Sequence, residues 1–75
     1  MTEASNRLLV CLDNSGYEVS LERRKIYVAL PDARAGNSGQ VRVIDESGED
    51  YLYPKQLFVE ISLPQPIRKA VLEAA

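Results

Sequence analysis

Short apolar or alternating runs recur along this chain, and clusters of Gly, Pro, Asn, Ser and Asp separate them. Each run is too short for a stable helix and is bounded by turn-forming residues, which is typical of strands. Where the alternation is strict, one face of the strand is expected to pack on a core. The pattern predicts five strands, at residues 7–13, 25–30, 40–45, 50–54 and 59–63.

Turn-forming residues predict how these strands are connected. "DNSGY" (13–17) favours a turn, and "DARAGNSG" (32–39) is a loop whose opening suits one short helical turn. "KQLF" (55–58), directly after Pro54, suits a single tight helical turn. Residues 1–6 are expected to form a frayed tail.

A helix is predicted after the last strand. Pro64 and Pro66 bracket a break in the pattern, and proline is well placed in the first turn of a helix. Leu72 falls away from the apolar stripe of this helix and would mark a homodimer contact if the chain pairs with itself. The stripe consists of Ile67, Ala70, Val71 and Ala74.

These elements indicate an all-β fold, a small barrel of about five strands with a short C-terminal helix that caps it. Closing the sheet hides strand edges that so short a chain cannot otherwise cover. We expect the barrel over residues 8–62, closed around Ile26, Val28 and Val43, and the helix over residues 66–74. The 75 residues suffice for one domain, residues 1–75.

Composition narrows the range of expected partners and cellular compartments. Nine Lys and Arg against 11 Asp and Glu give a net charge of −2, which argues against a broad nucleic-acid footprint. One cysteine permits no intrachain disulfide and fits a reducing cytoplasm, in our interpretation that of a bacterium. No run approaches the roughly 20 apolar residues of a membrane helix, so no membrane association is expected.

The acidic stretch "DESGED" (45–50) raises three hypotheses. Asp first and Gly fourth is the preference of a type I turn, with Gly48 in the left-handed conformation of a bulge and the carboxylates at a solvated tip. A calcium loop needs acidic ligands spread over about twelve residues, which this spacing lacks. A pair of catalytic acids needs a cleft, which a hairpin tip does not offer. We therefore predict a charged turn, with a weak cation or partner contact as the next alternative.

Other residues give little sign of catalysis. Histidine is absent, so the commonest general base and metal ligand is missing and the serines have no partner to activate them. Cys11 lies between Val10 and Leu12 and is expected to be a buried, inert thiol. "GNSG" lacks the Lys of a phosphate loop. We predict no enzyme, no cofactor and no metal site.

Tyrosines are the best candidates for a binding surface, because tyrosine buries area and keeps a polar tip. The predicted partner-binding residues are Tyr17, Tyr51, Tyr53 and Pro54, with Tyr51 and Tyr53 on one face of their strand. The alternative is that two or three of the four tyrosine rings, which include Tyr27, cover the barrel ends. A second hypothesis is a nucleic-acid site that uses "ERRK" (22–25), Arg42, Lys55 and the tyrosines.

Several segments resemble the barrels of the Src-homology-three-like (SH3-like) family. "LERRKIYVAL" is similar to the diverging turn and following strand, with Leu21 at the Leu position and Arg24 where the family usually has glycine. "DARAGNSG" falls at the second variable loop, and "QVRVIDESGEDYLYP" is similar to the central hairpin. "YPKQLFVEI" resembles the proline, short helical turn and final strand. The likeness covers roughly residues 8–62. The chain also resembles small bacterial proteins that carry a "VRVxDESGEDYLYP" core.

The resemblance implies a five-stranded barrel, but the chain departs from the family at the groove that binds proline-rich ligands. It has no Trp, Leu57 stands at the position of the groove tyrosine, and Gln56 stands near that of the asparagine. We therefore predict a non-catalytic module that binds another protein or peptide, as a monomer or weak homodimer. The alternative is a small nucleic-acid-binding barrel, and an enzyme is the least favoured.

Overall fold

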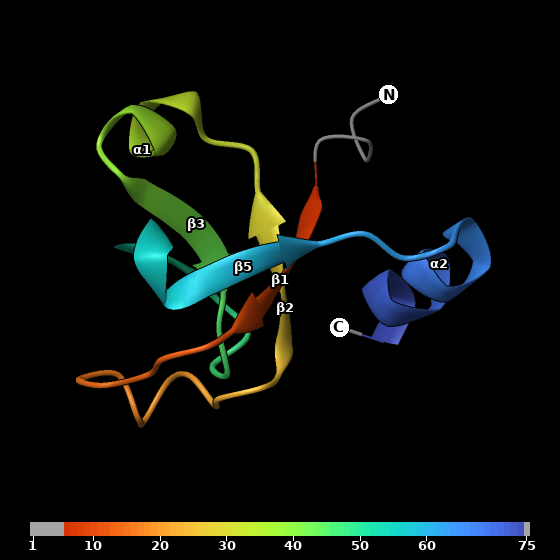
Figure 1. The fold of residues 1–75 in the computed structure, drawn as a ribbon, viewed down its shortest axis with the longest axis horizontal. Coiled ribbons are helices and arrows are strands. Elements are labelled where there is room, and N and C mark those ends of the chain that lie inside the picture. Colours follow the sequence, from red (N-terminus) through yellow and green to blue (C-terminus); the bar gives the residue numbers. More distant parts are fainter. Residues whose placement is uncertain (1–5, 75) are drawn as a thin grey trace.

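The computed structural model describes residues 6–74, so the predicted tail at residues 1–6 lies almost entirely outside the described residues. Within this range the chain forms a five-stranded, fully antiparallel sheet with the strand order β4-β3-β2-β1-β5. Figure 1 shows β5 crossing in front of β1 and β2, with β3 to one side. The strands are β1 (Arg7–Cys11), β2 (Ile26–Leu30), β3 (Gln40–Ile44), β4 (Asp50–Pro54) and β5 (Phe58–Ile61).

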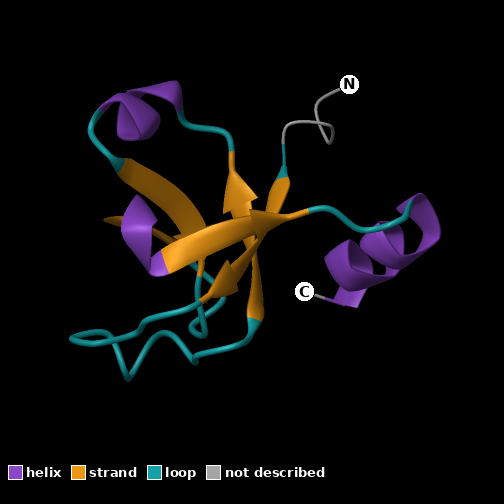
Figure 2. Cartoon of the chain, in the orientation of Figure 1, coloured by secondary structure: helices purple, strands orange, loops and turns teal. Residues whose placement is uncertain are grey.

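Helical segments lie around the strands (Figure 2). They are α1 (Ala33–Asn37), the 3₁₀ turn η2 (Lys55–Leu57) and α2 (Gln65–Ala74). Asp32 caps α1, because its side chain accepts a 3.0 Å hydrogen bond from the Ala35 N–H. All five strands and the three helical segments predicted from the sequence are confirmed, with ends that differ by at most two residues.

One face of the sheet packs on the main core. Its two tyrosines are Tyr27 and Tyr53, at 5% and 4% exposed, and Phe58 packs against the cluster from β5. The remaining core residues are Leu9, Cys11, Leu21, Ala29, Val41, Val43 and Leu57.

The predicted core face of β2 is wrong. Ile26 is 36% exposed and Val28 belongs to the opposite face, whereas Tyr27 and Ala29 enter the main core together with Val43. Both faces of β2 are apolar, so alternation alone could not select the inward face. The register decides it, because Tyr27 is paired with Leu9 of the core.

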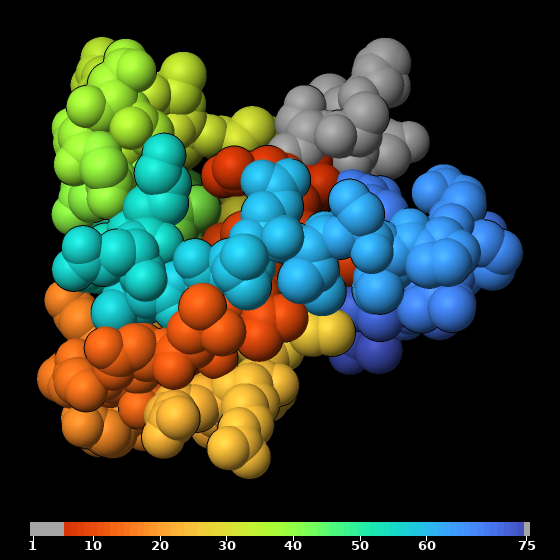
Figure 3. Space-filling view, viewed as in Figure 1, coloured from red at the N-terminus to blue at the C-terminus, as the bar shows by residue number. Residues whose placement is uncertain are grey.

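The other face of β1, β2 and β5 is aliphatic as well. Leu8 is paired with Val28 and Ile61, and Val10 is paired with Ile26 and Val59. Leu8 and Val28 are buried, whereas Ile26 and Val59 remain 36% and 45% exposed. In the space-filling view α2 forms a lobe beside these strands (Figure 3), and α2 itself has no buried residue among those described. α2 therefore covers this second face only in part.

The turn before β2 contains one strained position. Arg24 has φ +69°, and it is the one non-glycine residue with positive φ among those described. Its N–H donates a 2.7 Å hydrogen bond to the Cys11 carbonyl, which holds the turn against the end of β1. A left-handed conformation costs a residue with a side chain about 1 kcal/mol or more, so the tertiary contacts impose this geometry.

Candidate functional site

Three of the four predicted partner-binding residues, Tyr51, Tyr53 and Pro54, lie on β4. β4 stands at one end of the strand order and is paired with β3 alone. Tyr51 is 50% exposed and Leu52 is 41% exposed, and successive residues of a strand project to opposite faces. An edge strand with a large apolar side chain exposed on each face is therefore the main candidate site.

The hydrogen bonds at the two ends of the β3–β4 ladder determine which backbone groups of β4 are free. At one end the Asp45 N–H donates to the Glu49 carbonyl, and at the other the Lys55 N–H donates to the Gly39 carbonyl, both at 3.0 Å. Hydrogen-bonded and non-hydrogen-bonded pairs alternate in an antiparallel ladder. The Arg42–Leu52 pair is therefore of the non-hydrogen-bonded kind, and the Leu52 N–H and C=O point away from β3.

Pro54 fits the same alternation. It is paired with Gln40, which is the next non-hydrogen-bonded position after Arg42–Leu52. A residue there does not donate to β3, so the missing N–H of proline costs no ladder bond. The free edge of β4 accordingly offers backbone groups at Asp50 and Leu52, and Pro54 limits its length. Among residues 6–74 no backbone hydrogen bond from a loop reaches this edge.

Tyr53 does not form part of an exposed patch, which corrects the prediction for this residue. It is 4% exposed, and Tyr17 packs edge-on against it with ring centroids 5.2 Å apart. Tyr17 itself is 36% exposed. Tyr51 and Tyr53 do share one side of β4, but Tyr53 belongs to the main core and Tyr51 remains exposed. The structure thus brings Tyr17 and Tyr53 into contact, whereas Tyr51 remains exposed.

The hairpin between β3 and β4 contains the predicted turn. The Gly48 N–H donates a 3.0 Å hydrogen bond to the Asp45 carbonyl, and Gly48 has φ +85°. The expectation that all its carboxylates are solvated is wrong, because Asp45 is only 7% exposed. Asp45 accepts 2.6 Å hydrogen bonds from the hydroxyls of Tyr53 and Ser47. Burial raises the pKa of Asp45, but these hydrogen bonds outweigh it and hold the pKa below its usual value.

Glu46 is likewise engaged. It accepts a 2.6 Å hydrogen bond from the Tyr27 hydroxyl and pairs with Lys25 Nζ at 2.6 Å. Lys25 and Tyr27 together lower the pKa of Glu46. The Tyr27 hydroxyl also accepts a hydrogen bond from the Glu22 N–H. These contacts join the hairpin tip to the turn before β2, so the carboxylates of Asp45 and Glu46 are engaged in holding the fold together.

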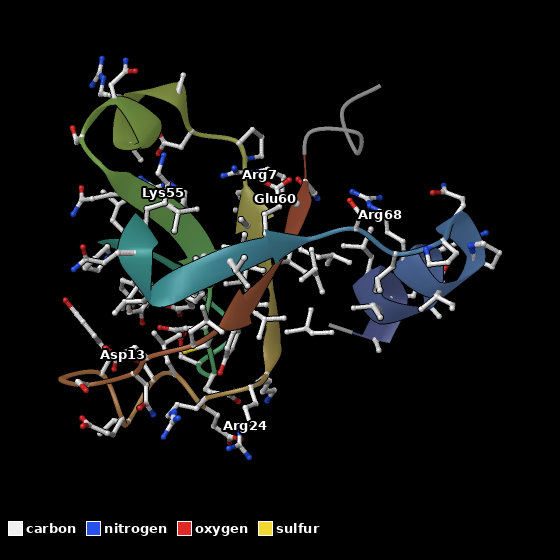
Figure 4. The ribbon with its side chains drawn as sticks, viewed as in Figure 1. Arg7, Asp13, Arg24, Lys55, Glu60 and Arg68 are labelled. Carbon is white, nitrogen blue, oxygen red and sulfur yellow. The ribbon has the colours of Figure 1, made fainter. Side chains whose placement is uncertain are left out.

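Two basic side chains of the proposed nucleic-acid site are held in ion pairs. Lys25 is paired with Glu46, and Arg42 is paired with Asp32 at 2.8 Å and with Asp50 at 2.9 Å. Figure 4 places Arg24, Lys55 and Arg68 in separate parts of the molecule. Two of the basic residues invoked for a nucleic-acid site are thus neutralised.

Reactive side chains and metal-ligand clusters are scarce in the described part of the chain. Cys11 is fully buried, as predicted, and burial raises the pKa of its thiol. The structure of residues 6–74 contains no group of three or more His, Cys, Asp or Glu side chains placed to hold a metal ion.

A pocket of about 300 Å³ lies between β2, the hairpin tip and the C-terminal end of α2. Ile26, Val28 and Ile44 form its apolar wall, and Lys25 and Glu46 line its polar side. This Lys and Glu are paired with each other, so neither is a free polar group of the kind that usually orients a small ligand.

Comparison of the chain with protein-family models, with curated proteins and with solved structures gave no match in any of the three. Among the helices of residues 6–74, none has both the length and the apolar character required to span a membrane.

Leu52 is the site residue that sequence reasoning missed. Its apolar character suggests a place in the core, yet it lies on the outer face of an edge strand. Pro54 gave a usable signal, because proline in a strand favours an edge position.

Proposed function

We propose that this protein is a non-catalytic module that binds an extended segment of another protein or peptide, which adds as a further strand to the free edge of β4. The observation that carries the proposal is the outward-directed backbone of Leu52, flanked by the exposed side chains of Tyr51 and Leu52. Strand addition to a sheet edge gains affinity from main-chain hydrogen bonds and selectivity from the neighbouring side chains.

We further infer that the five strands form an SH3-like barrel that is left open along β4, which pairs with β3 alone. The strand order, the helical turn η2 after Pro54 and the left-handed Arg24, at a position where the family has glycine, support this classification. The site on β4 differs from the aromatic groove with which that family binds proline-rich ligands, and the burial of Tyr53 and Leu57 supports a different mode of binding.

Nucleic-acid binding is the second candidate function. A site for single strands needs basic residues interleaved with aromatic rings, and here Lys25 and Arg42 are held by carboxylates. Salt-dependent retention of the protein on immobilised single-stranded RNA or DNA would favour this function over peptide binding.

Selection from a displayed library of random peptides, followed by affinity measurements on matched variants, tests strand addition. Leu52→Pro removes the outward N–H without breaking a bond to β3, whereas Leu52→Ala keeps that N–H and removes most of the side chain. We expect Leu52→Pro to weaken binding at least tenfold, because it removes roughly one main-chain hydrogen bond and adds a steric block. Leu52→Ala should weaken binding only a few-fold.

Tyr51→Pro is the internal control for the register. The Tyr51 N–H points toward Val43 of β3, so proline there should lower the unfolding midpoint, while Leu52→Pro should leave the circular dichroism spectrum unchanged. Selected peptides that bind Leu52→Pro as tightly as Leu52→Ala would show that β4 does not accept a strand. Failure to select any peptide would count against the function itself.

A further inference from the structure

Resting on strand addition at β4, we infer the direction and the charge pattern of the bound segment. The segment runs antiparallel to β4, with an acidic residue toward its N-terminus, two apolar residues at its centre and a basic residue toward its C-terminus. The charges at the two ends of β4 and the exposure of Tyr51 and Leu52 carry this inference.

Negative charge gathers where β4 begins. Glu49 is exposed, and its carboxylate accepts a 3.0 Å hydrogen bond from the Tyr51 hydroxyl, which directs it along the start of the strand. Asp50 shares the guanidinium of Arg42 with Asp32, so two carboxylates face one positive charge. Because Glu49 has no ion-pair partner among residues 6–74, this end of β4 attracts a basic side chain.

Positive charge lies at the other end of the strand. Lys55 follows Pro54 directly, is exposed and has no ion-pair partner in the described range. Its backbone N–H is fixed to the Gly39 carbonyl, so the side chain starts from a defined point beside β4. An acidic residue of the bound segment can therefore pair with Lys55 while a basic residue pairs with Glu49.

The direction follows from the geometry of the sheet. All four strand pairs of the described chain are antiparallel, and an antiparallel pair is slightly more stable per residue than a parallel one. In an antiparallel addition the N-terminal end of the segment lies near Lys55 and its C-terminal end near Glu49. The acidic residue therefore precedes the basic one, by about six positions when the segment is fully extended.

Two neighbouring apolar residues complete the pattern. A residue opposite Leu52 projects to the same face as Leu52, and the residue after it projects to the face of Tyr51. One apolar residue of the segment then covers Leu52, and the next one covers Tyr51. The pattern is acidic, two polar, two apolar, one polar and basic.

Two synthetic peptides of identical composition test the inference by NMR titration at low salt. The first is Glu-Thr-Thr-Val-Tyr-Thr-Lys, and the second exchanges its terminal charges to give Lys-Thr-Thr-Val-Tyr-Thr-Glu. Exposed ion pairs each contribute roughly 0.2–1 kcal/mol, so exchanging two attractive contacts for two repulsive ones should weaken binding about tenfold. The double variant Glu49→Lys, Lys55→Glu should reverse the preference, and the difference should shrink at high salt.

Each other outcome overturns a defined part of the inference. Tighter binding of the second peptide to the wild-type protein would mean that the segment runs parallel to β4. Equal affinities that both fall on Leu52→Pro would remove the charge pattern and leave strand addition intact. If neither peptide binds, the inferred pattern is wrong, whereas strand addition itself is decided by the response of library-selected peptides to Leu52→Pro.

Discussion

The hydroxyl of Tyr53 donates a 2.6 Å hydrogen bond to Asp45 Oδ2, and both residues are almost fully buried. Their side chains lie eight residues apart in the sequence, on β4 and at the hairpin tip. The same hydroxyl lies 2.9 Å from Ser20 Oγ, and the Ser20 carbonyl accepts a 3.1 Å hydrogen bond from the Glu46 N–H. This bond therefore anchors the edge strand, the hairpin tip and the preceding loop to one another.

Tyr53→Phe is expected to destabilise the protein by about 1–2 kcal/mol, because it leaves a buried carboxylate with one hydrogen bond fewer. The free energy of unfolding measured in urea checks this expectation. Tyr51→Phe is the matched control: the Tyr51 hydroxyl bonds Glu49 at the surface, and its loss should leave the unfolding midpoint unchanged. Equal effects of the two variants would mean that the buried bond contributes little.

Acid is expected to destabilise the fold through the carboxylates of the hairpin. The folded state lowers the pKa values of Asp45 and Glu46, so these groups bind fewer protons in the folded than in the unfolded chain. Their stabilising contribution is complete above their unfolded pKa values, about 4, and is lost as the pH falls through the folded values.

The midpoint of urea unfolding should accordingly stay level from about pH 8 to pH 6 and decline below about pH 4.5. Glu46→Gln should make this decline shallower, because it removes one carboxylate whose pKa the fold lowers. A decline with the same slope in Glu46→Gln as in the wild type would exclude Glu46 as a source of the acid sensitivity.

Arg24→Gly is expected to stabilise the protein by about 0.5–1 kcal/mol. The left-handed conformation costs a residue with a side chain roughly 1–2 kcal/mol, and the greater backbone freedom of glycine in the unfolded chain offsets part of the gain. Arg23→Gly is the control, because Arg23 has no positive φ and gains nothing from glycine. A lower unfolding midpoint for Arg24→Gly would show that the Arg24 side chain makes a contact of its own.

Cys11 is expected to resist thiol reagents in the native protein and to react fully in denaturant. It has no exposed surface, and burial raises the pKa of its thiol, so both access and the thiolate fraction are low. The labelling rate at rising urea concentrations should follow the unfolded fraction. Rapid labelling without urea would indicate a local opening of β1.

Much of the secondary structure could be predicted from the sequence, because its signals are local. Turn residues such as Gly48 and strand breakers such as Pro54 act within a few positions, and the short helical turns after Asp32 and Pro54 are confirmed. The burial of Cys11 between two apolar neighbours could be predicted for the same reason. The candidate site was found in part, since Tyr51 and Pro54 lie on the edge strand.

The remainder depended on contacts between distant segments. Ile26 and Tyr27 are both apolar enough for a core, and only the pairing of Tyr27 with Leu9 selected the inward residue. Tyr53 looked like a surface tyrosine until Asp45 and Ser20 supplied buried partners for its hydroxyl.

By itself, the sequence determined where the chain turns and where it runs as strand or helix, because φ/ψ preferences and hydrophobic periodicity are properties of neighbouring residues. Only the tertiary structure decided which face of β2 is buried, which carboxylates are held by tyrosines, and that β4 is left with a free edge. Those outcomes depend on register and strand order, which arise when strands from distant parts of the chain pair with one another.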